Sequence, residues 1–181
     1  MALVSDNVRV GVTGAVYVAP SATALPTSTA ASLNAAFTDV GYIGEDGVTT
    51  STGTDTSEIK AWQNGDVVRR VQTSHDFTVQ FAMIETNAKS LELYYGNYTS
   101  GGAGSGSVQV TGTQPYRGSF VVHVVDDTDL IRIVIPDGQV SERGDVSYVN
   151  ENAVSLDVTI TCYPDASGVK AYLYFETAGA S

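Results

Sequence analysis

The stretch Phe77-Thr78-Val79-Gln80-Phe81-Ala82-Met83 alternates large apolar side chains with smaller or polar ones without a break. Successive side chains of a β-strand point to opposite faces, so this period of two predicts a strand that is buried on one face. The strand is expected to span 76–85. Other stretches rich in β-branched residues predict strands at 8–18, 37–43, 66–72, 107–113, 117–125, 129–135, 138–148, 153–163 and 168–175.

One helix is expected among these strands, at 87–95. Thr86 or Asn87 can cap its N-terminus, and Gly96 is placed to end it. Apolar residues spaced three and four apart form a single stripe along a helix, and such a stripe is typical of packing against a core. The residues of the predicted stripe are Ala88, Leu91 and Tyr95.

Short strands at roughly ten-residue spacing, separated by turn sequences, are typical of a sandwich or barrel. We therefore predict a mainly β protein, a β-sandwich or partial barrel with one short flanking α-helix. The length of 181 residues is enough for one domain. The Gly/Ser-rich segment 100–107 is interpreted as a surface loop of a single domain spanning 1–181, because neither side of it has enough strands for a separate core.

Charge and cysteine content exclude several classes of protein. The chain has 9 Lys and Arg against 20 Asp and Glu, which gives a net charge of −11. Proteins that bind nucleic acid tightly need a basic surface, so tight binding to nucleic-acid phosphates is excluded. The single cysteine, Cys162, argues against a disulfide-stabilised secreted protein. No signal peptide or transmembrane segment is expected, and the chain is interpreted as folding in a cytoplasm.

No residue pattern indicates catalysis. The two histidines are His75, expected at a turn, and His123, expected within a strand, and neither has a base–nucleophile motif around it. Cys162 is expected to be a small core residue. The turn containing Asp126, Asp127 and Asp129 lacks calcium-loop spacing. We predict no catalytic residues, no metal site, no cofactor and no enzyme activity.

A second segment stands out because it contains almost nothing to bury. Residues 44–57 are mostly Thr, Ser, Gly and acidic residues. A loop this long inside a compact domain is usually functional or disordered. We expect a long polar loop at 44–60, with a mobile hairpin tip as the alternative interpretation.

Several fragments, taken in order, resemble one protein family. They are Gly14-Ala15-Val16-Tyr17-Val18-Ala19-Pro20, Leu25-Pro26, Phe37-Thr38-Asp39-Val40-Gly41-Tyr42-Ile43, Glu45-Asp46-Gly47-Val48, Ala61-Trp62-Gln63-Asn64-Gly65-Asp66-Val67-Val68-Arg69, Ile84-Glu85-Thr86-Asn87, Leu93-Tyr94-Tyr95-Gly96, Ile135-Pro136-Asp137-Gly138-Gln139-Val140, Glu142-Arg143-Gly144-Asp145 and Tyr163-Pro164-Asp165. The ordered set resembles the major tail proteins, or tail tube subunits, of long-tailed non-contractile bacteriophages, especially those infecting actinobacteria. The resemblance covers nearly the whole chain.

This resemblance implies a fold, an assembly and partners. It implies the tail-tube fold, with subunits that close into hexameric rings and stack into a tube conducting double-stranded DNA during ejection. The partners it implies are further copies of the chain, a tape-measure protein, and tail terminator and tail-tip proteins, with no membrane. The location it implies is the virion tail, and the host cytoplasm during assembly. The family has no catalytic residues.

Simple geometry agrees with such a tube. If six subunits each give about four strands to a shared barrel, about 24 strands at roughly 4.8 Å spacing form a barrel about 45–50 Å across. That width admits a DNA duplex. An acidic lumen would let DNA slide without sticking, although a merely solubilising negative surface explains the net charge nearly as well.

The polar loop at 44–60 is the expected contact between stacked rings. Residues 1–7, interpreted as an N-terminal arm, and the last few residues are lesser candidates. The assembly residues predicted in and near the loop are Glu45, Asp46, Val48, Thr50, Thr52, Asp55, Glu58, Trp62 and Arg69.

Two alternatives remain open from the sequence. An immunoglobulin-like binding module shares the β-rich composition, and would stay monomeric and expose a cluster of aromatic residues. A related secretion-system tube protein shares the ring architecture, with less tendency to polymerise alone.

Overall fold

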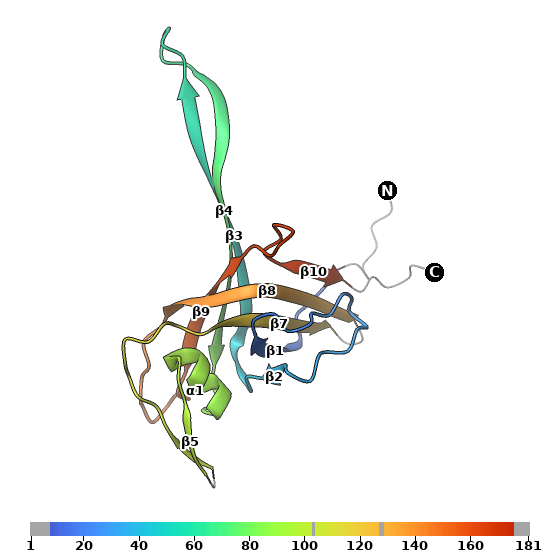
Figure 1. The fold of residues 1–181 in the computed structure, drawn as a ribbon, viewed down its shortest axis with the longest axis vertical. Helices are drawn as coiled ribbons and strands as arrows, with labels where there is room; N and C mark the ends of the chain where they lie inside the picture. Colours follow the sequence, from blue (N-terminus) through green and yellow to red (C-terminus); the bar gives the residue numbers. More distant parts are fainter. Residues whose placement is uncertain (1–7, 103, 127–128, 176–181) are drawn as a thin grey trace.

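The structure is a computed structural model that describes residues 8–102, 104–126 and 129–175. Most of its strands join one curled antiparallel sheet, from which a long hairpin projects (Figure 1). The elements, in chain order, are β1 Thr13–Pro20, β2 Thr38–Asp39, β3 Ile43–Lys60, β4 Val67–Met83, α1 Ala88–Tyr95, β5 Thr99–Gly102, β6 Ser105–Ser107, β7 Arg117–Asp126, β8 Asp129–Arg143, β9 Leu156–Tyr163 and β10 Tyr172–Phe175.

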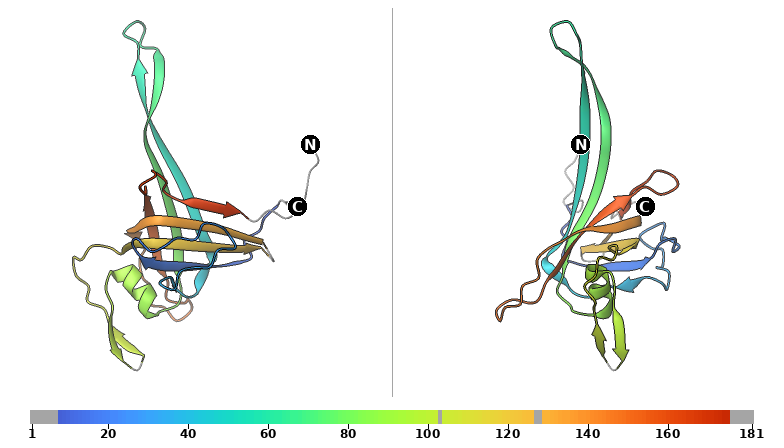
Figure 2. Two further views of the ribbon diagram at one scale, coloured as in Figure 1. Left: turned by 45° about the vertical axis from the view of Figure 1, so that its right-hand side comes forward. Right: turned by 60° about the vertical axis from the view of Figure 1, so that its left-hand side comes forward.

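The main sheet has the strand order β2-β1-β7-β8-β9-β4-β3, and β10 pairs with β8 beside this path. The sheet curls until β1, which is next to the two-residue end strand β2, and the start of β3 line opposite sides of one groove. This arrangement is a partial barrel, and the predicted mainly β class with one short helix is confirmed. Figure 2 shows the curled body from two sides, with the hairpin leaving it.

The core lies inside the curl. The alternation in 77–83 places Val79, Phe81 and Met83 in the core, each at most 3% exposed. Other strands contribute apolar residues of the same kind, such as Ile160 on the neighbouring β9 and Phe120 on β7. Burying a side chain of this size contributes about 1.5–3 kcal/mol, so this cluster is the main source of stability.

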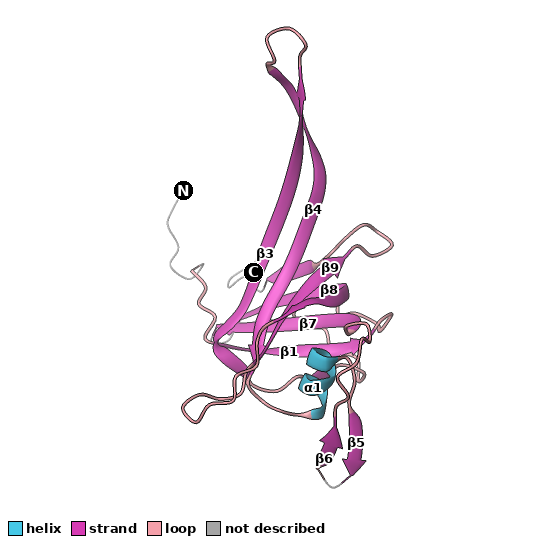
Figure 3. Ribbon diagram, turned by 90° about the vertical axis from the view of Figure 1, so that its left-hand side faces the viewer, coloured by secondary structure: helices cyan, strands magenta, loops and turns pink. Residues whose placement is uncertain are grey.

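Helix α1 covers one end of the curled sheet (Figure 3). The Asn87 side chain caps it by accepting hydrogen bonds from the backbone N–H groups of Lys89 and Ser90, both at 2.9 Å. Gly96 ends it in a left-handed conformation with φ 82°. The helix expected at 87–95 is therefore confirmed, with Asn87 as its cap.

The buried face of α1 differs from the predicted stripe. Leu91 and Tyr95 are partly buried and pack against the core, but Ala88 is exposed, so its predicted packing role is wrong. At about 100° per residue, the buried residues lie roughly 140° around the helix from the predicted stripe. They are Ser90, Leu93 and Tyr94. A hydrogen bond of Ser90 explains the difference. Its hydroxyl donates to the Glu85 carbonyl at 2.7 Å, so this polar side chain can be buried with a hydrogen-bond partner.

The main correction concerns the segment expected to be a loop. Residues 44–60 belong to β3, which pairs with β4 along most of its length. Threonine favours extended backbone, and a strand of a two-stranded ribbon needs no buried face. Absence of apolar residues therefore did not mean absence of structure. The strands expected at 66–72 and 76–85 are likewise one continuous strand, β4, which places His75 in a strand and not at a turn.

Other boundaries also shift. The strands expected at 129–135 and 138–148 are one strand, β8, which ends at Arg143. Pro136-Asp137-Gly138 lies within it, at a register shift against β7, where a proline is tolerated. The segment 100–107 contains the small β5–β6 hairpin. The strand expected at 107–113 is mostly irregular, and those expected at 8–18, 37–43 and 168–175 are shorter than predicted. The predicted arm 1–7 and the final residues 176–181 lie outside the described residues.

Candidate functional site

All nine residues predicted for assembly lie on the β3–β4 hairpin. Eight of them are exposed, and Val48 is partly buried against the core. From root to tip and back they are Glu45, Asp46, Val48, Thr50, Thr52, Asp55, Glu58, Trp62 and Arg69. The structure therefore gathers them on one element that projects from the body, although they are spread along its length (Figure 1).

The shaft of the hairpin is a two-stranded ribbon. Strand β9 pairs with β4 only from Thr78 to Met83, so beyond Phe77 the ribbon has no third strand among the described residues. Side-chain pairs hold it together: the Ser74 hydroxyl donates to Asp55 at 2.8 Å, and Arg70 pairs with Glu58. A two-stranded hairpin is marginally stable alone in water, so this ribbon is stabilised mainly at its root.

The threonines of the shaft share one face. Strand β3 keeps an unbroken register from Val48 to Asp55, and side chains two residues apart point the same way. Thr50, Thr52 and Thr54 therefore continue, beyond the body, the face that Val48 presents to the core. Their hydroxyls make the ribbon soluble while their branched Cβ atoms favour the extended backbone.

The hairpin end exposes apolar surface. Trp62 is 97% exposed in a turn that the Ala61 N–H closes by donating to the Asp66 carbonyl at 2.7 Å. Asn64 and Gly65 both have positive φ, 65° and 70°, as a tight turn requires. Exposed apolar residues around Trp62 are Ile59, Val67, Val68 and Val71. Several exposed apolar side chains near the end of one projecting element indicate an interaction surface.

The same end is cationic. Lys60, Arg69 and Arg70 are three of the nine basic residues in a chain whose net charge is −11. Arg70 is paired with Glu58, but the side chains of Lys60 and Arg69 make no hydrogen bond or ion pair within the described residues. These side chains are therefore available to carboxylates of another molecule. We call Ile59–Val71 the hairpin end.

The titratable groups inside the body are structural. The Arg132 Nε donates to His123 Nε2 at 2.9 Å, and its Nη1 donates to the carbonyls of Ser28 and Ala31 at 2.6 and 2.7 Å. Burial, then the charge of Arg132, lowers the pKa of His123 to about 4. Arg132 thus fastens the 21–37 loop over the sheet.

No feature of the described chain indicates a reaction. Burial raises the pKa of Cys162 to about 12, so the thiol is not a nucleophile at neutral pH. Across residues 8–102, 104–126 and 129–175, no three His, Cys, Asp or Glu residues are grouped to hold a metal ion. Within the same ranges, no helix is long and apolar enough to cross a membrane.

Sequence reasoning missed part of this surface. It did not single out Lys60, Arg70, Val67 or Val68, which complete the hairpin end. The clustering of three basic residues within 60–70 was visible in a chain with only nine. What the sequence did not reveal is that β3 and β4 bring both sides of that cluster together at a tip.

Comparisons with known proteins agree with this structure. Residues 1–178 match the family model of the phage tail tube protein, whereas the sequence matches no curated protein at a significant level. One similar solved structure is the sheath–tube complex of an extracellular contractile injection system, at 10% identity and TM-score 0.50, covering 90% of this chain and 88% of that one.

Two other similar structures have lower scores. The anti-feeding prophage cap has 9% identity and TM-score 0.48, covering 97% of this chain and all of that chain (100%). A virion of a native gene transfer agent has 11% identity and TM-score 0.40, covering 80% and 92%. The family match spans nearly the whole sequence, so the chain belongs to the phage tail tube protein family.

Proposed function

We propose that six copies of this chain close into a ring, and that rings stack through the β3–β4 hairpin into the tube of a long, non-contractile phage tail. The observation that carries this proposal is the hairpin itself. Its shaft has no third strand within the described chain, and its end exposes Trp62 together with unpaired cations. Such a ribbon, stabilised mainly at its root, gains further stability by contacting another molecule.

Free strand edges support ring closure. The outer edge of β3 has no neighbouring strand within the described chain, and neither does the edge of the first β1 residues that faces away from β7. Exposed edges are templates for pairing with another chain, and a closed ring of subunits removes them. The whole chain, 1–181, acts in this proposal as a single tail-tube domain, and the ordered fragments quoted above favour a phage that infects actinobacteria.

The charge balance supports passage of DNA. A chain with net charge −11 would repel phosphates along a shared lumen, so a DNA duplex would move without being held. In this proposal the tube surrounds a tape-measure protein before ejection, ends at tail terminator and tail-tip proteins, and assembles in the host cytoplasm before it becomes part of the virion tail.

A truncated hairpin tests the proposal. Residues 54–75 are replaced by an Asn-Gly turn, which keeps the Gly53–Asp76 pair and every residue that contacts the core. The wild-type protein should form hollow tubes in negative-stain electron microscopy, and the truncated protein should stay folded but form no tubes, remaining as monomers or single six-fold rings. Wild-type monomers even with tail-tip components present would favour the immunoglobulin-like module. Normal tubes from the truncated chain would contradict the role of the hairpin.

A further inference from the structure

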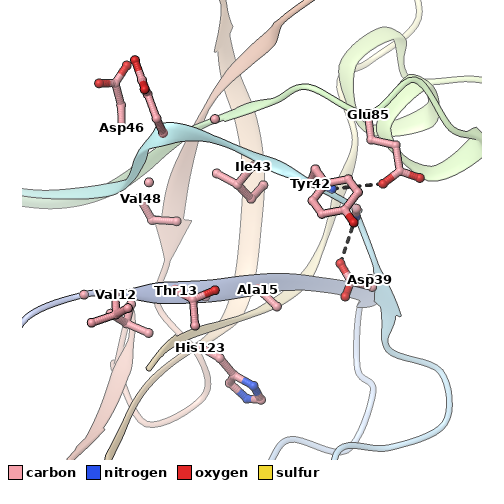
Figure 4. A pocket seen from close by; sticks show the side chains of 17 residues that line it. Val12, Thr13, Ala15, Asp39, Tyr42, Ile43, Asp46, Val48, Glu85 and His123 are labelled. Atoms are coloured by element: carbon pink, nitrogen blue, oxygen red, sulfur yellow. Dashed lines mark hydrogen bonds between the residues drawn. The ribbon is translucent and has the colours of Figure 1, made fainter. Parts of the chain in front are cut away.

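A groove lies where the two ends of the curled sheet face each other. Its volume is about 770 Å³, within the range of sites that bury a ligand of moderate size. Strand β1 forms one wall and the root of β3 the other, and Ile43 and Val48 point from β3 toward β1 (Figure 4). Val12 and Tyr42 line it while remaining 69% and 76% exposed. The groove therefore offers apolar side chains that the described chain leaves uncovered.

A β-bulge gives the groove its acidic rim. Ile43 pairs with Met83 and Val48 with Phe81, so residues 44–47 stand opposite a single residue of β4. Extra residues of this kind re-aim side chains away from the ladder. Glu45 and Asp46 lie in the bulge, are exposed, and have no hydrogen-bond or ion-pair partner in the described part of the chain.

Two further carboxylates fix the loop beside this rim. Asp39 accepts a hydrogen bond from the Gly41 N–H at 2.9 Å, and Glu85 accepts one from the Tyr42 N–H at 3.1 Å (Figure 4). These bonds hold Tyr42 at the mouth of the groove. The site thus combines a positioned aromatic ring, exposed apolar side chains and unpaired negative charge.

The hairpin end has the complementary properties. Residues 59–71 carry three cations, Lys60, Arg69 and Arg70, and one carboxylate, Asp66, which gives a net charge of +2. Trp62 and its apolar neighbours are exposed between these charges. On a chain of net charge −11, this is an unusual cationic, apolar surface, and electrostatic complementarity of this kind selects and orients a partner.

A hairpin end cannot reach the groove of its own chain. Strand β3 begins at Ile43, in the groove wall, and ends at Lys60 beside the turn. At roughly 3.3 Å per residue the two lie about 50 Å apart. The views of Figure 2 agree, because the hairpin runs straight away from the body. The groove of a second copy is therefore the available partner surface.

We propose that the groove between β1 and the root of β3 receives the hairpin end of a second copy of this chain. Trp62 supplies the apolar contact, and Lys60 and Arg69 meet Glu45 and Asp46. Such a contact is heterologous, since each copy offers one end and one groove, and a heterologous contact between stacked rings can propagate along a tube. This inference rests on the proposed function and names the receiving surface.

Two variants, each lacking one side of the proposed contact, test it. The tip donor carries Glu45→Lys and Asp46→Lys, which leave its hairpin end intact and reverse its groove. The groove donor carries the Asn-Gly truncation of 54–75, which leaves its groove intact. Neither should form tubes alone, and the mixture should form a larger complex that contains the two chains in a 1:1 ratio in sedimentation-velocity and sizing experiments. Circular dichroism checks that both are folded.

Charge swaps provide the matched controls. A groove donor with Glu45→Lys and Asp46→Lys should bind the wild-type end at least about tenfold more weakly, a difference of about 1.4 kcal/mol. It should instead bind a chain whose end carries Lys60→Glu and Arg69→Glu. Reversing two exposed carboxylates elsewhere, with Glu142→Lys and Glu151→Lys, should leave binding unchanged.

The outcomes separate this inference from the proposed function. The groove is supported as the receptor if the two donors form a complex, if reversing the groove charges weakens it, and if reversing the charges of the hairpin end as well restores it. Wild-type tubes together with donors that do not associate with each other would overturn the groove as the receptor. A donor complex whose affinity is unchanged by the charge swaps would overturn it as well. Either result leaves the proposed tube function intact. Wild-type chains that never assemble, even with tail-tip components, contradict the tube function itself.

Discussion

Acidification should weaken the clamp that Arg132 forms beneath the 21–37 loop. The Arg132 Nε donates to His123 Nε2 at 2.9 Å, which requires His123 to be neutral with its proton on Nδ1. Protonating Nε2 would remove this acceptor and place two positive charges against each other. The remaining groups near the ring are Tyr17, at 5.1 Å between ring centroids, and Asp39, whose charge partly offsets the effect of Arg132.

The magnitude follows from the pKa of His123, which is lowered from 6.5 to about 4 in the folded protein. Above pH 6.5 the imidazole is neutral in both states, so the site contributes no pH dependence. As pH falls from 6.5 to 4, His123 binds a proton in the unfolded chain but not in the folded one. The free energy of unfolding therefore decreases by up to about 1.4 kcal/mol per pH unit. The upper limit is about 3 kcal/mol, and solvent screening of a half-buried ring reduces it to about 1–2 kcal/mol.

Urea unfolding between pH 7.5 and 4 measures this loss. Far-UV circular dichroism is the suitable signal, because Trp62 is 97% exposed at the hairpin end and does not report on the core. Many carboxylates titrate in the same range, so the informative quantity is the difference between wild type and His123→Gln, which keeps an acceptor but cannot gain a proton. His75→Gln is the matched control, since His75 is exposed on the hairpin away from the clamp.

The expected result is a stability gap between wild type and His123→Gln that shifts by about 1–2 kcal/mol in favour of the variant as pH falls from 6.5 to 4. Loss of protection at the 21–37 loop in hydrogen exchange should accompany it. A gap that stays constant across this range would refute the reasoning, because it would mean that His123 binds protons equally in the folded and unfolded chain.

Three substitutions test the body of the fold, each by the midpoint of urea unfolding. Gly138→Ala should cost about 1–3 kcal/mol, because the new Cβ would lie 2.8 Å from Ile160 Cγ2 in a packed core. Asn87→Ala should cost about 1–2 kcal/mol through loss of the helix cap, and Asn87→Asp should recover part of it. Tyr94→Phe should cost about 0.5–1.5 kcal/mol, because the Tyr94 hydroxyl donates to the Gly144 carbonyl at 2.5 Å. An unchanged midpoint in any of the three would contradict the contact concerned.

The sequence was most informative where burial and periodicity coincide. The alternation through Phe77 to Met83 predicted a strand with one buried face, and Val79, Phe81 and Met83 are indeed in the core. The helix was predictable because Asn87 and Gly96 mark its ends with side-chain and backbone chemistry that acts locally. Its buried face was not, because Ser90 is buried through a hydrogen bond to Glu85 that depends on the preceding turn.

The groove was beyond sequence reasoning for a different reason. Its walls come from β1 and from the root of β3, and only the curl of the whole sheet brings these two ends together. Glu45 and Asp46 were singled out as assembly residues, but as parts of a loop. Their place in a bulge depends on the register between β3 and β4, and a shift of register is not encoded in any short pattern.

The threonine-rich strand that resembled a loop has a composition that suits its place in the molecule. A strand made of Val and Ile at these positions would be extended but would aggregate along its free edge, whereas one made of Gly and Ser would be soluble but poorly ordered. Threonine combines a branched Cβ, which favours extended backbone, with a hydroxyl that water can solvate. In the proposed tube, such a ribbon keeps the free subunit soluble and already holds the strand geometry that a neighbouring copy requires. The polar composition that led to the prediction of a loop is therefore the same property that keeps the exposed hairpin soluble in the free subunit.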